Sequence, residues 1–330
     1  MKFGPVSVSE ADGAILAHGV RTGDVLYRKG QRLGATERAA LAAAGIGTVT
    51  VAQLEQGDIA EDEAARRLAE IIAGPGTLAG AASTGRVNLF AEHAGLLSFD
   101  PAAIDAVNRV TEDVTLATFP PLSPVEAGRM VATIKIIPFA VAGAVLRECL
   151  AAAKAAVAIV APFRPLAARL IQTVNAGLKP SVMAKTSQVT ADRMARLGGS
   201  LTGETRCPHE IGRLTAEMKT ALDASCDLLL VIGASAIVDR RDVIPAAILQ
   251  LGGRIERLGM PVDPGNLILI GEIGGTPVLG LPGCARSPSR NGLDWVLERL
   301  SVGLPVTAGD VARMGVGGLL IGQEEEKDYL

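Results

Sequence analysis

The chain has 330 residues, a formal net charge of −3 at pH 7 and 3% aromatic residues. This length allows two or three domains with well-buried cores. A negative net charge argues against a nucleic-acid partner, which normally meets a basic face. The longest apolar region, residues 138–163, is interrupted by charged side chains and is not expected to enter a membrane. The N-terminal residues lack the apolar core of a signal peptide, and the four cysteines show no CxxC spacing. We therefore expect a cytoplasmic α/β protein without a zinc site or disulfide framework.

Residues 1–58 are expected to form a β-rich first module. Short apolar pairs alternate with glycine turns in residues 20–34, a helix is predicted over 37–44, and a short strand over 48–51. The polar run 53–58 is typical of a linker.

Residues 59–177 are expected to form a middle α/β module. A helix over 62–73 ends at Gly74-Pro75-Gly76, and a second helix is predicted over 101–110. A strand over 130–137, a helix over 140–154 and a strand over 156–161 follow the βαβ pattern of a parallel sheet.

A polar loop, Ser83-Thr84-Gly85-Arg86, precedes an apolar segment of the middle module. One interpretation is a phosphate or pterin contact made by the arginine. The other interpretation is a turn with a solvated arginine, and the sequence leaves both open.

Residues 178–303 are expected to form the third and main module, with residues 304–330 as a tail. A strand over 180–184 leads into Lys185-Thr186-Ser187, and helices are predicted over 190–197, 211–224, 243–251 and 294–300. The apolar run 228–232 has the length of a strand buried on both faces of a parallel sheet. Together these elements predict a three-layer, doubly wound, mostly parallel sheet. The acidic run 323–328 is expected to be disordered.

Three loops of the third module are candidates for one ligand pocket, because ligands in open α/β sheets bind at the carboxyl ends of strands. The first is Gly233-Ala234-Ser235-Ala236, followed by Asp239-Arg240-Arg241-Asp242. Its small residues allow close approach of an anion to backbone N–H groups, and its arginines could hold phosphate. Asp239 and Asp242 either cap the following helix or act as carboxylates that hold Mg²⁺ or orient an oxyanion.

The second and third loops are Pro264-Gly265-Asn266 and Pro282-Gly283-Cys284-Ala285. The third is followed by Arg286 and Ser287, which are donors for an anion. Cys284 has no histidine near it in sequence and is expected to be an inert small residue. His209 is expected to cap a helix, with catalysis as the alternative.

These residues resemble the molybdopterin-binding domain shared by molybdopterin adenylyltransferases of the MoaB and Mog type and by molybdenum insertases, the molybdopterin molybdotransferases. Gly233-Ala234-Ser235-Ala236 is similar to their glycine-rich strand end. Arg241-Asp242-Val243-Ile244-Pro245 resembles the adenylyltransferase segment Arg-Asp-Val-Thr-Pro, and Gly280-Leu281-Pro282-Gly283 resembles the insertase segment Gly-Leu-Pro-Gly. Residues 23–26, 30–34 and 44–46 of the first module are also similar to an insertase segment. Molybdopterin-binding regions found with molybdenum cofactor cytidylyltransferases resemble the chain as well.

The resemblance implies a role in molybdenum cofactor biosynthesis, with molybdopterin or the finished molybdenum cofactor as ligand. It implies that Asp242 and Asp239 are catalytic and that Asp242 binds Mg²⁺. It also implies that the ligand is held by the residues of the three loops and of the 185–187 segment: Lys185, Thr186, Ser187, Gly233, Ala234, Ser235, Arg241, Pro264, Gly265, Asn266, Pro282, Gly283, Cys284, Arg286 and Ser287.

The chain also departs from the family. Lys185-Thr186-Ser187-Gln188 stands where insertases carry Ser-Thr-Gly-Asp-Glu, and Asn266 stands where they often carry lysine. Anion donors are therefore retained while some acids are missing.

Three functions remain open from the sequence. The first is an insertase-like transferase, and the second is a carrier that passes the cofactor to a cytidylyltransferase or a molybdoenzyme. The third is a nucleotide hydrolase of the competence-damage type. The resemblance also implies a homodimer, with the apolar, glycine-rich first module as a suitable contact.

Overall fold

The computed structural model describes residues 1–320, and the chain forms two compact units that divide between Pro162 and Phe163. The acidic run 323–328, for which disorder is expected, lies outside the described residues. None of the helices in the described part is both long and apolar enough to cross a membrane.

The first part of unit 1 is rich in β structure and has a small core of its own. A sheet of order β1-β5-β2 and the hairpin β3-β4 enclose buried side chains that include Leu16, Leu33 and Leu41. The elements are β1 (Lys2–Ser7), η1 (Val8–Glu10), β2 (Ile15–Leu16), β3 (Val20–Thr22), β4 (Val25–Tyr27), α1 (Ala35–Ala43) and β5 (Thr48–Gln53).

The rest of unit 1 consists of small antiparallel sheets covered by three helices. Its elements are β6 (Asp58–Ala60), α2 (Glu61–Ile72), β7 (Thr77–Ala79), β8 (Arg86–Ala91), β9 (Gly95–Ser98), α3 (Pro101–Val110), β10 (Val114–Thr118), β11 (Pro124–Val125), β12 (Met130–Ile136), β13 (Ala140–Ala142), α4 (Gly143–Ala153) and β14 (Ile159–Pro162). The strand orders are β10-β12-β8-β7, β11-β9-β14 and β13-β6.

The parallel βαβ unit predicted over 130–161 is wrong. Both strands are present, but β12 pairs antiparallel with β8 and β10, while β14 pairs antiparallel with β9. The chain between them contains the helix that the pattern predicts, and the two strands join different sheets. Periodicity identifies a strand and its faces, but it does not identify the partner strand.

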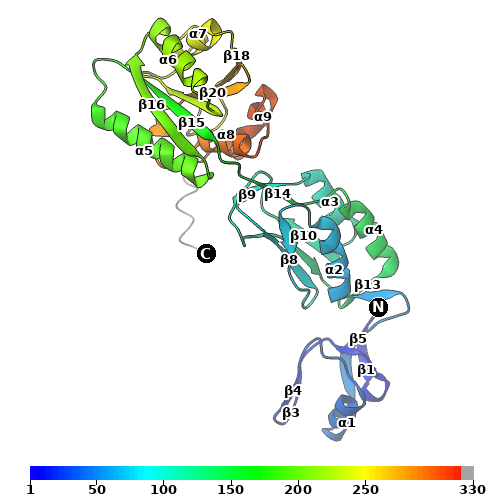
Figure 1. Cartoon of the computed structure of the whole chain (residues 1–330). Helices are drawn as coiled ribbons and strands as arrows, with labels where there is room; N and C mark the ends of the chain where they lie inside the picture. Colours follow the sequence, from blue (N-terminus) through cyan, green and yellow to red (C-terminus); the bar gives the residue numbers. More distant parts are fainter. Residues whose placement is uncertain (321–330) are drawn as a thin grey trace. The chain divides into compact units, whose positions relative to one another are not determined.

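Unit 2 is a three-layer α/β domain around one six-stranded sheet of order β16-β15-β17-β20-β19-β18 (Figure 1). Strands β15, β16, β17 and β20 are parallel, and β19 is antiparallel to both of its neighbours. The elements are β15 (Ala167–Val174), α5 (Pro180–Arg196), β16 (Ser200–Pro208), α6 (Ile211–Asp223), β17 (Leu228–Ile232), α7 (Val243–Gln250), β18 (Arg254–Leu258), β19 (Leu269–Ile273), β20 (Thr276–Leu281), η2 (Gly283–Arg286), α8 (Gly292–Ser301), α9 (Ala308–Ala312) and η3 (Arg313–Gly315).

The two faces of this sheet are covered by different helices. Side chains of α5 and α8 pack on one face, together with Leu228 and Leu230 of β17. Side chains of α6 and α7 pack on the other face, together with Leu229 and Val231. The alternation along β17 shows why this strand reads as a continuous apolar run, since both of its faces are buried. The predicted doubly wound fold is confirmed.

The strand predicted over 180–184 is wrong, because these residues are the first turn of α5. Pro180 occupies the first helical position, where its missing N–H is not needed. Buried residues recur along α5 at helical spacing, at Met183, Thr186, Val189 and Thr190. The strand that precedes this helix is β15, which pairs with β16 and β17. Unit 2 therefore starts before the boundary expected at residues 177/178.

The segment after residue 303 is not only a tail. Val311 of α9 and Met314 of η3 are buried in the core cluster that α5 and α8 share. The Leu320 N–H donates to the Asp263 carbonyl at 2.8 Å. Residues 304–320 therefore belong to the fold of unit 2.

Candidate functional site

The carboxyl ends of the parallel strands in unit 2 gather the loops in which the sequence places most of the candidate residues. After β15 the chain runs through α5 to β16, on one side of the sheet order. After β17 it runs through α7 to β18, at the opposite end of the sheet order. A crevice forms between neighbouring strands whose connections diverge in this way, and it is the usual ligand site of the fold. The loops that follow β17, β18 and β20 all leave this edge.

The loop after β17 is tightly turned and presents backbone N–H groups. A Cβ on Gly233 would lie 2.4 Å from the Ser235 carbonyl oxygen, so only glycine fits there. The Ala234 N–H donates to Thr173 Oγ1 at 2.9 Å, and the same hydroxyl lies 2.7 Å from His209 Nδ1. Within residues 1–320, the N–H groups of Ser235 and Ala236 make no hydrogen bond. Two free, exposed N–H groups in one turn are suited to an anion.

Arg286 is a cationic residue that contacts this turn directly. Its Nη2 donates to the Gly233 carbonyl at 3.2 Å, and its Nη1 donates to Thr186 Oγ1 at 2.7 Å. Burial lowers the pKa of this half-buried guanidinium. Both acceptors are neutral, and no carboxylate among the described residues pairs with Arg286. A partly desolvated cation without a counter-charge favours an anionic ligand.

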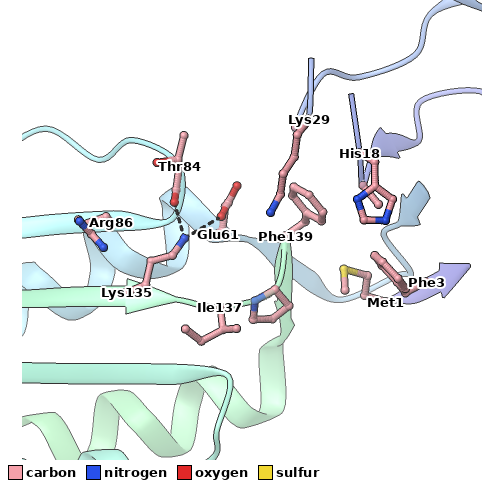
Figure 2. A pocket seen from close by; sticks show the side chains of 13 residues that line it. Met1, Phe3, His18, Lys29, Glu61, Thr84, Arg86, Lys135, Ile137 and Phe139 are labelled. Atoms are coloured by element: carbon pink, nitrogen blue, oxygen red, sulfur yellow. Dashed lines mark hydrogen bonds and ion pairs between the residues drawn. The ribbon is translucent and has the colours of Figure 1, made fainter. Parts of the chain in front are cut away.

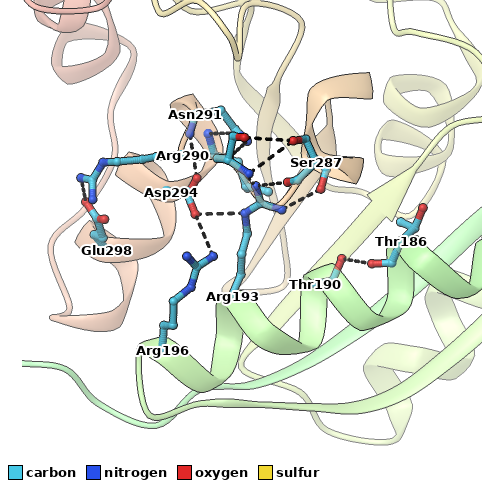
Figure 3. A network of polar contacts seen from close by, with 12 residues as sticks. Thr186, Thr190, Arg193, Arg196, Ser287, Arg290, Asn291, Asp294 and Glu298 are labelled. Atoms are coloured by element: carbon cyan, nitrogen blue, oxygen red, sulfur yellow. Dashed lines mark hydrogen bonds and ion pairs between the residues drawn. The ribbon is translucent and has the colours of Figure 1, made fainter. Parts of the chain in front are cut away.

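The loop that carries Arg286 is held from below by a second arginine, Arg193 of α5 (Figure 3). Its side chain is 2% exposed and donates to three backbone carbonyls of the loop, those of Ala285 (2.7 Å), Ser287 (2.6 Å) and Ser289 (3.0 Å). Its Nε donates to Asp294 Oδ1 at 3.0 Å. The planar guanidinium therefore fixes the end of η2 and the irregular segment that follows it, as its five donors permit.

A third polar cluster lies between β15, α5 and β16. Gln172 Nε2 donates to Glu204 Oε1 at 2.9 Å, and Ser187 Oγ donates to Glu204 Oε2 at 2.6 Å. Desolvation raises the pKa of the Glu204 carboxyl, but donors from Arg206, Ser187 and Gln172 outweigh it and the net pKa is lowered. Ser187 is thus engaged inside the protein. Gln172 Oε1 is buried without a hydrogen-bond partner.

The two aspartates of the β17–α7 loop have local partners. Asp242 is the N-cap of α7, where its carboxylate accepts from the Val243 N–H at 2.7 Å. Asp239 accepts from the side chain of Arg241 at 2.8 Å, and this hydrogen bond lowers the pKa of Asp239. Across residues 1–320 there is no group of three histidine, cysteine or acidic side chains that could hold a metal ion.

The other predicted residues include both packed and exposed positions. Gly265 lies against Gly292, whose N–H donates to the Pro264 carbonyl at 2.8 Å, so the loop after β18 is packed onto the start of α8. Asn266 and Gly283 are exposed, while burial raises the pKa of the Cys284 thiol and keeps it in its neutral form. Lys185 is exposed on α5.

The structure brings together only part of the predicted set. Arg286 contacts both Thr186 and Gly233, and Ala234, the next residue along the chain, is held by Thr173. Residues 185–188, which the sequence compares with the insertase segment Ser-Thr-Gly-Asp-Glu, lie within α5. Sequence reasoning missed Gln172, Thr173 and Arg193. The polar pair Gln172-Thr173 at the end of an otherwise apolar run was the available signal for the first two.

No protein-family model matches the chain, and no curated protein sequence matches it. Among solved structures, the chain is similar to the molybdopterin biosynthesis protein MoeA from Pyrococcus horikosii, with 15% identity over 92% of this chain and 76% of that one, at a TM-score of 0.31. It is similar to MogA with 18% identity over 41% of this chain and 94% of that one, at a TM-score of 0.30. It is also similar to the molybdopterin biosynthesis enzyme MoaB from Thermus thermophilus, with 18% identity over 43% of this chain and 98% of that one, at a TM-score of 0.29. Superpositions at such TM-scores carry no argument, so function is inferred from the residues of this chain.

Proposed function

We propose that unit 2 binds molybdopterin, or the finished molybdenum cofactor, at the carboxyl edge of its sheet, and that the protein acts in molybdenum cofactor biosynthesis. The observation that carries this is Arg286, a half-buried guanidinium without a carboxylate partner among residues 1–320. It contacts Gly233, beside the free N–H groups of Ser235 and Ala236. In this proposal, the phosphate of the ligand lies between the Arg286 guanidinium and these N–H groups. The motifs around residues 233, 241 and 280, which resemble those of molybdopterin-binding domains, support the choice of ligand.

Binding and transfer, rather than a metal-assisted reaction, are the chemistry that these contacts support. Asp242 caps α7 and Asp239 pairs with Arg241, so both carboxylates already have partners within the loop. A carrier that delivers the cofactor to a cytidylyltransferase or a molybdoenzyme is therefore the preferred role. An insertase-like transfer of molybdenum is the second candidate. It is favoured by Gly280-Leu281-Pro282-Gly283, which resembles the insertase segment Gly-Leu-Pro-Gly.

The binding proposal is tested by calorimetric titration of the full chain with purified molybdopterin. The variant Arg286→Gln removes the charge and keeps a polar side chain. The matched control is Arg254→Gln, because Arg254 is an exposed arginine at the start of β18, at the opposite edge of the sheet. We expect Arg286→Gln to weaken binding by tenfold or more, since a charge-assisted hydrogen bond contributes about 1.5–3 kcal/mol. Equal affinities of the two variants would contradict the assignment.

A turnover assay distinguishes a carrier from an insertase. Molybdate-dependent breakdown of adenylylated molybdopterin is expected to be absent for a carrier. Turnover that is lost in Asp242→Ala would establish the insertase role instead. Hydrolysis of a nicotinamide nucleotide would point to a hydrolase of the competence-damage type. The homodimer remains a prediction, which sedimentation of the full chain would test.

A further inference from the structure

Unit 1 contains a pocket of about 740 Å³ that is unrelated to the edge of the large sheet. Its wall is formed by the end of β12 and the residues after it, by the 84–86 loop, by the turn after β4 and by the N-terminal strand (Figure 2). Drug-sized ligands usually occupy cavities of roughly 300–1,000 Å³. The pocket is therefore large enough for a small organic molecule.

Three cationic side chains and one carboxylate line this pocket: Lys29, Arg86, Lys135 and Glu61. These four carry a formal charge of +2 in a chain whose net charge is −3. Lys135 Nζ lies 3.6 Å from Glu61 Oε2 and donates to the Thr84 carbonyl at 2.5 Å. In the described part of the chain, neither Lys29 nor Arg86 has a carboxylate partner. Most of the positive charge in the pocket is thus uncompensated by the protein.

The register of the sheet places two of these cations side by side. Lys135 of β12 is directly opposite Arg86 of β8 in an antiparallel pair, so both side chains leave the same face. Like charges in such positions destabilise a sheet, and Glu61 offsets only one of them. An anion between Arg86 and Lys135 would relieve the repulsion.

The opposite part of the pocket is apolar and aromatic. Lys29 Nζ lies 5.8 Å from the centroid of the Phe139 ring. The two side chains are neighbours in Figure 2. Ile137 and Phe3 are about 60% exposed although both are large apolar side chains, and both line the pocket. Such exposed apolar groups next to cations are suited to a ligand that has both an anionic and an apolar part.

We propose that this pocket binds a small organic phosphate. Its phosphate group lies between Arg86 and Lys135, and its ring packs against Phe139 and Ile137, beside Lys29. A phosphate is preferred to a single carboxylate because its two negative charges match the formal charge of the pocket. The loop Ser83–Arg86, for which the sequence leaves open a phosphate contact, supplies one wall. This site does not depend on the ligand site proposed for unit 2.

Adenosine 5′-monophosphate serves as the probe, because it combines a phosphate with an aromatic ring. Acetylation of lysines in the full chain, followed by mass spectrometry, gives a readout at each lysine. We expect the nucleotide to protect Lys29 and Lys135 and to leave Lys154, an exposed lysine at the end of α4, unprotected. Protection of Lys29 and Lys135 no greater than that of Lys154 would overturn the site.

The variant Arg86→Gln is expected to weaken this protection by about tenfold, because it removes one charge-assisted contact. Arg109→Gln is the matched control, since Arg109 is an exposed arginine of the same unit that pairs with Asp105 on α3. Equal protection in the two variants would refute the role of Arg86. Adenosine, which lacks the phosphate, is expected to protect at least tenfold less well, and equal protection by both compounds would refute an anion site.

Folding of Arg86→Gln is checked by thermal unfolding. We expect no loss of stability, because within residues 1–320 the Arg86 side chain has no hydrogen-bond or ion-pair partner and its removal relieves the repulsion with Lys135. Arg286→Gln separates this site from that of unit 2. It is expected to leave the protection of Lys29 and Lys135 unchanged. Loss of protection in Arg286→Gln would assign the nucleotide to unit 2 and overturn the site in unit 1.

Discussion

Replacement of Arg193 by lysine is expected to destabilise unit 2 far more than its conservative character suggests. The arginine is almost fully buried and makes four hydrogen bonds, three to carbonyls of the 285–289 loop and one to Asp294. A lysine keeps the charge but concentrates its donors on one atom, so it cannot reach both the loop and the carboxylate. Loss of two charge-assisted hydrogen bonds, at about 1.5 kcal/mol or more each, lowers the free energy of unfolding by about 3 kcal/mol.

The single tryptophan of the chain makes this loss measurable within unit 2 alone. Trp295 lies in α8, next to Asp294, and its fluorescence reports the unfolding of this unit. With a denaturant dependence of roughly 2 kcal/mol per M urea, a loss of about 3 kcal/mol lowers the unfolding midpoint by about 1.5 M.

Arg196→Lys is the control for this substitution. Arg196 lies one turn further along α5, its side chain is 59% exposed, and it approaches Asp294 only to 4.0 Å. We expect its replacement to change the free energy of unfolding by less than about 0.5 kcal/mol. If Arg193→Lys were no more destabilising than Arg196→Lys, the buried guanidinium would not be what holds the loop of Arg286.

Three other substitutions give separate tests. Burial raises the pKa of Glu298 from 4.5 to about 7, although Arg290 lies 2.9 Å away. Because the folded state binds this proton more tightly than the unfolded state, protonated Glu298 adds about 3 kcal/mol to the free energy of unfolding below pH 4.5. This contribution is lost as the pH rises to 7. The difference in unfolding free energy between the wild type and Glu298→Gln should fall by this amount over that pH range, and a constant difference would contradict the shift. Gly265 has φ +141°, and Gly265→Ala places a Cβ 2.8 Å from the Gly292 backbone. The substitution should lower the free energy of urea unfolding by about 2–4 kcal/mol. A reduction below about 0.5 kcal/mol would show that the loop moves to accept the Cβ. Asp242→Ala removes a helix N-cap and should lower the free energy of urea unfolding by about 1 kcal/mol. If the protein is a carrier, the affinity for molybdopterin should not change. A large loss of affinity would instead make Asp242 part of the ligand site.

The sequence predicts those parts of unit 2 whose signals are local. The run 228–232 and the helix after it are found as predicted, since an apolar run buried on both faces and an aspartate cap are visible in short windows. The strand predicted over 180–184 is wrong, because Val182 and Met183 also suit a strand and only the longer spacing to Val189 and Met194 reveals the helix.

The polar contacts of the site required the tertiary structure. Arg193 and the carbonyls that it binds are more than 90 residues apart in sequence, and Thr186 meets Arg286 across 100 residues. No spacing rule connects such pairs. In unit 1 the pairing of β12 with β8 rather than β14 likewise depends on long-range packing, and it is this pairing that places Arg86 opposite Lys135.

The most direct test of the proposed function is a crystal structure of the full chain with bound molybdopterin. We predict that the ligand phosphate lies within hydrogen-bond distance of the Arg286 guanidinium and of the N–H groups of Ser235 and Ala236, at the carboxyl edge of the sheet. A ligand bound at that edge with its phosphate away from Arg286, or bound only in unit 1, would contradict the assignment.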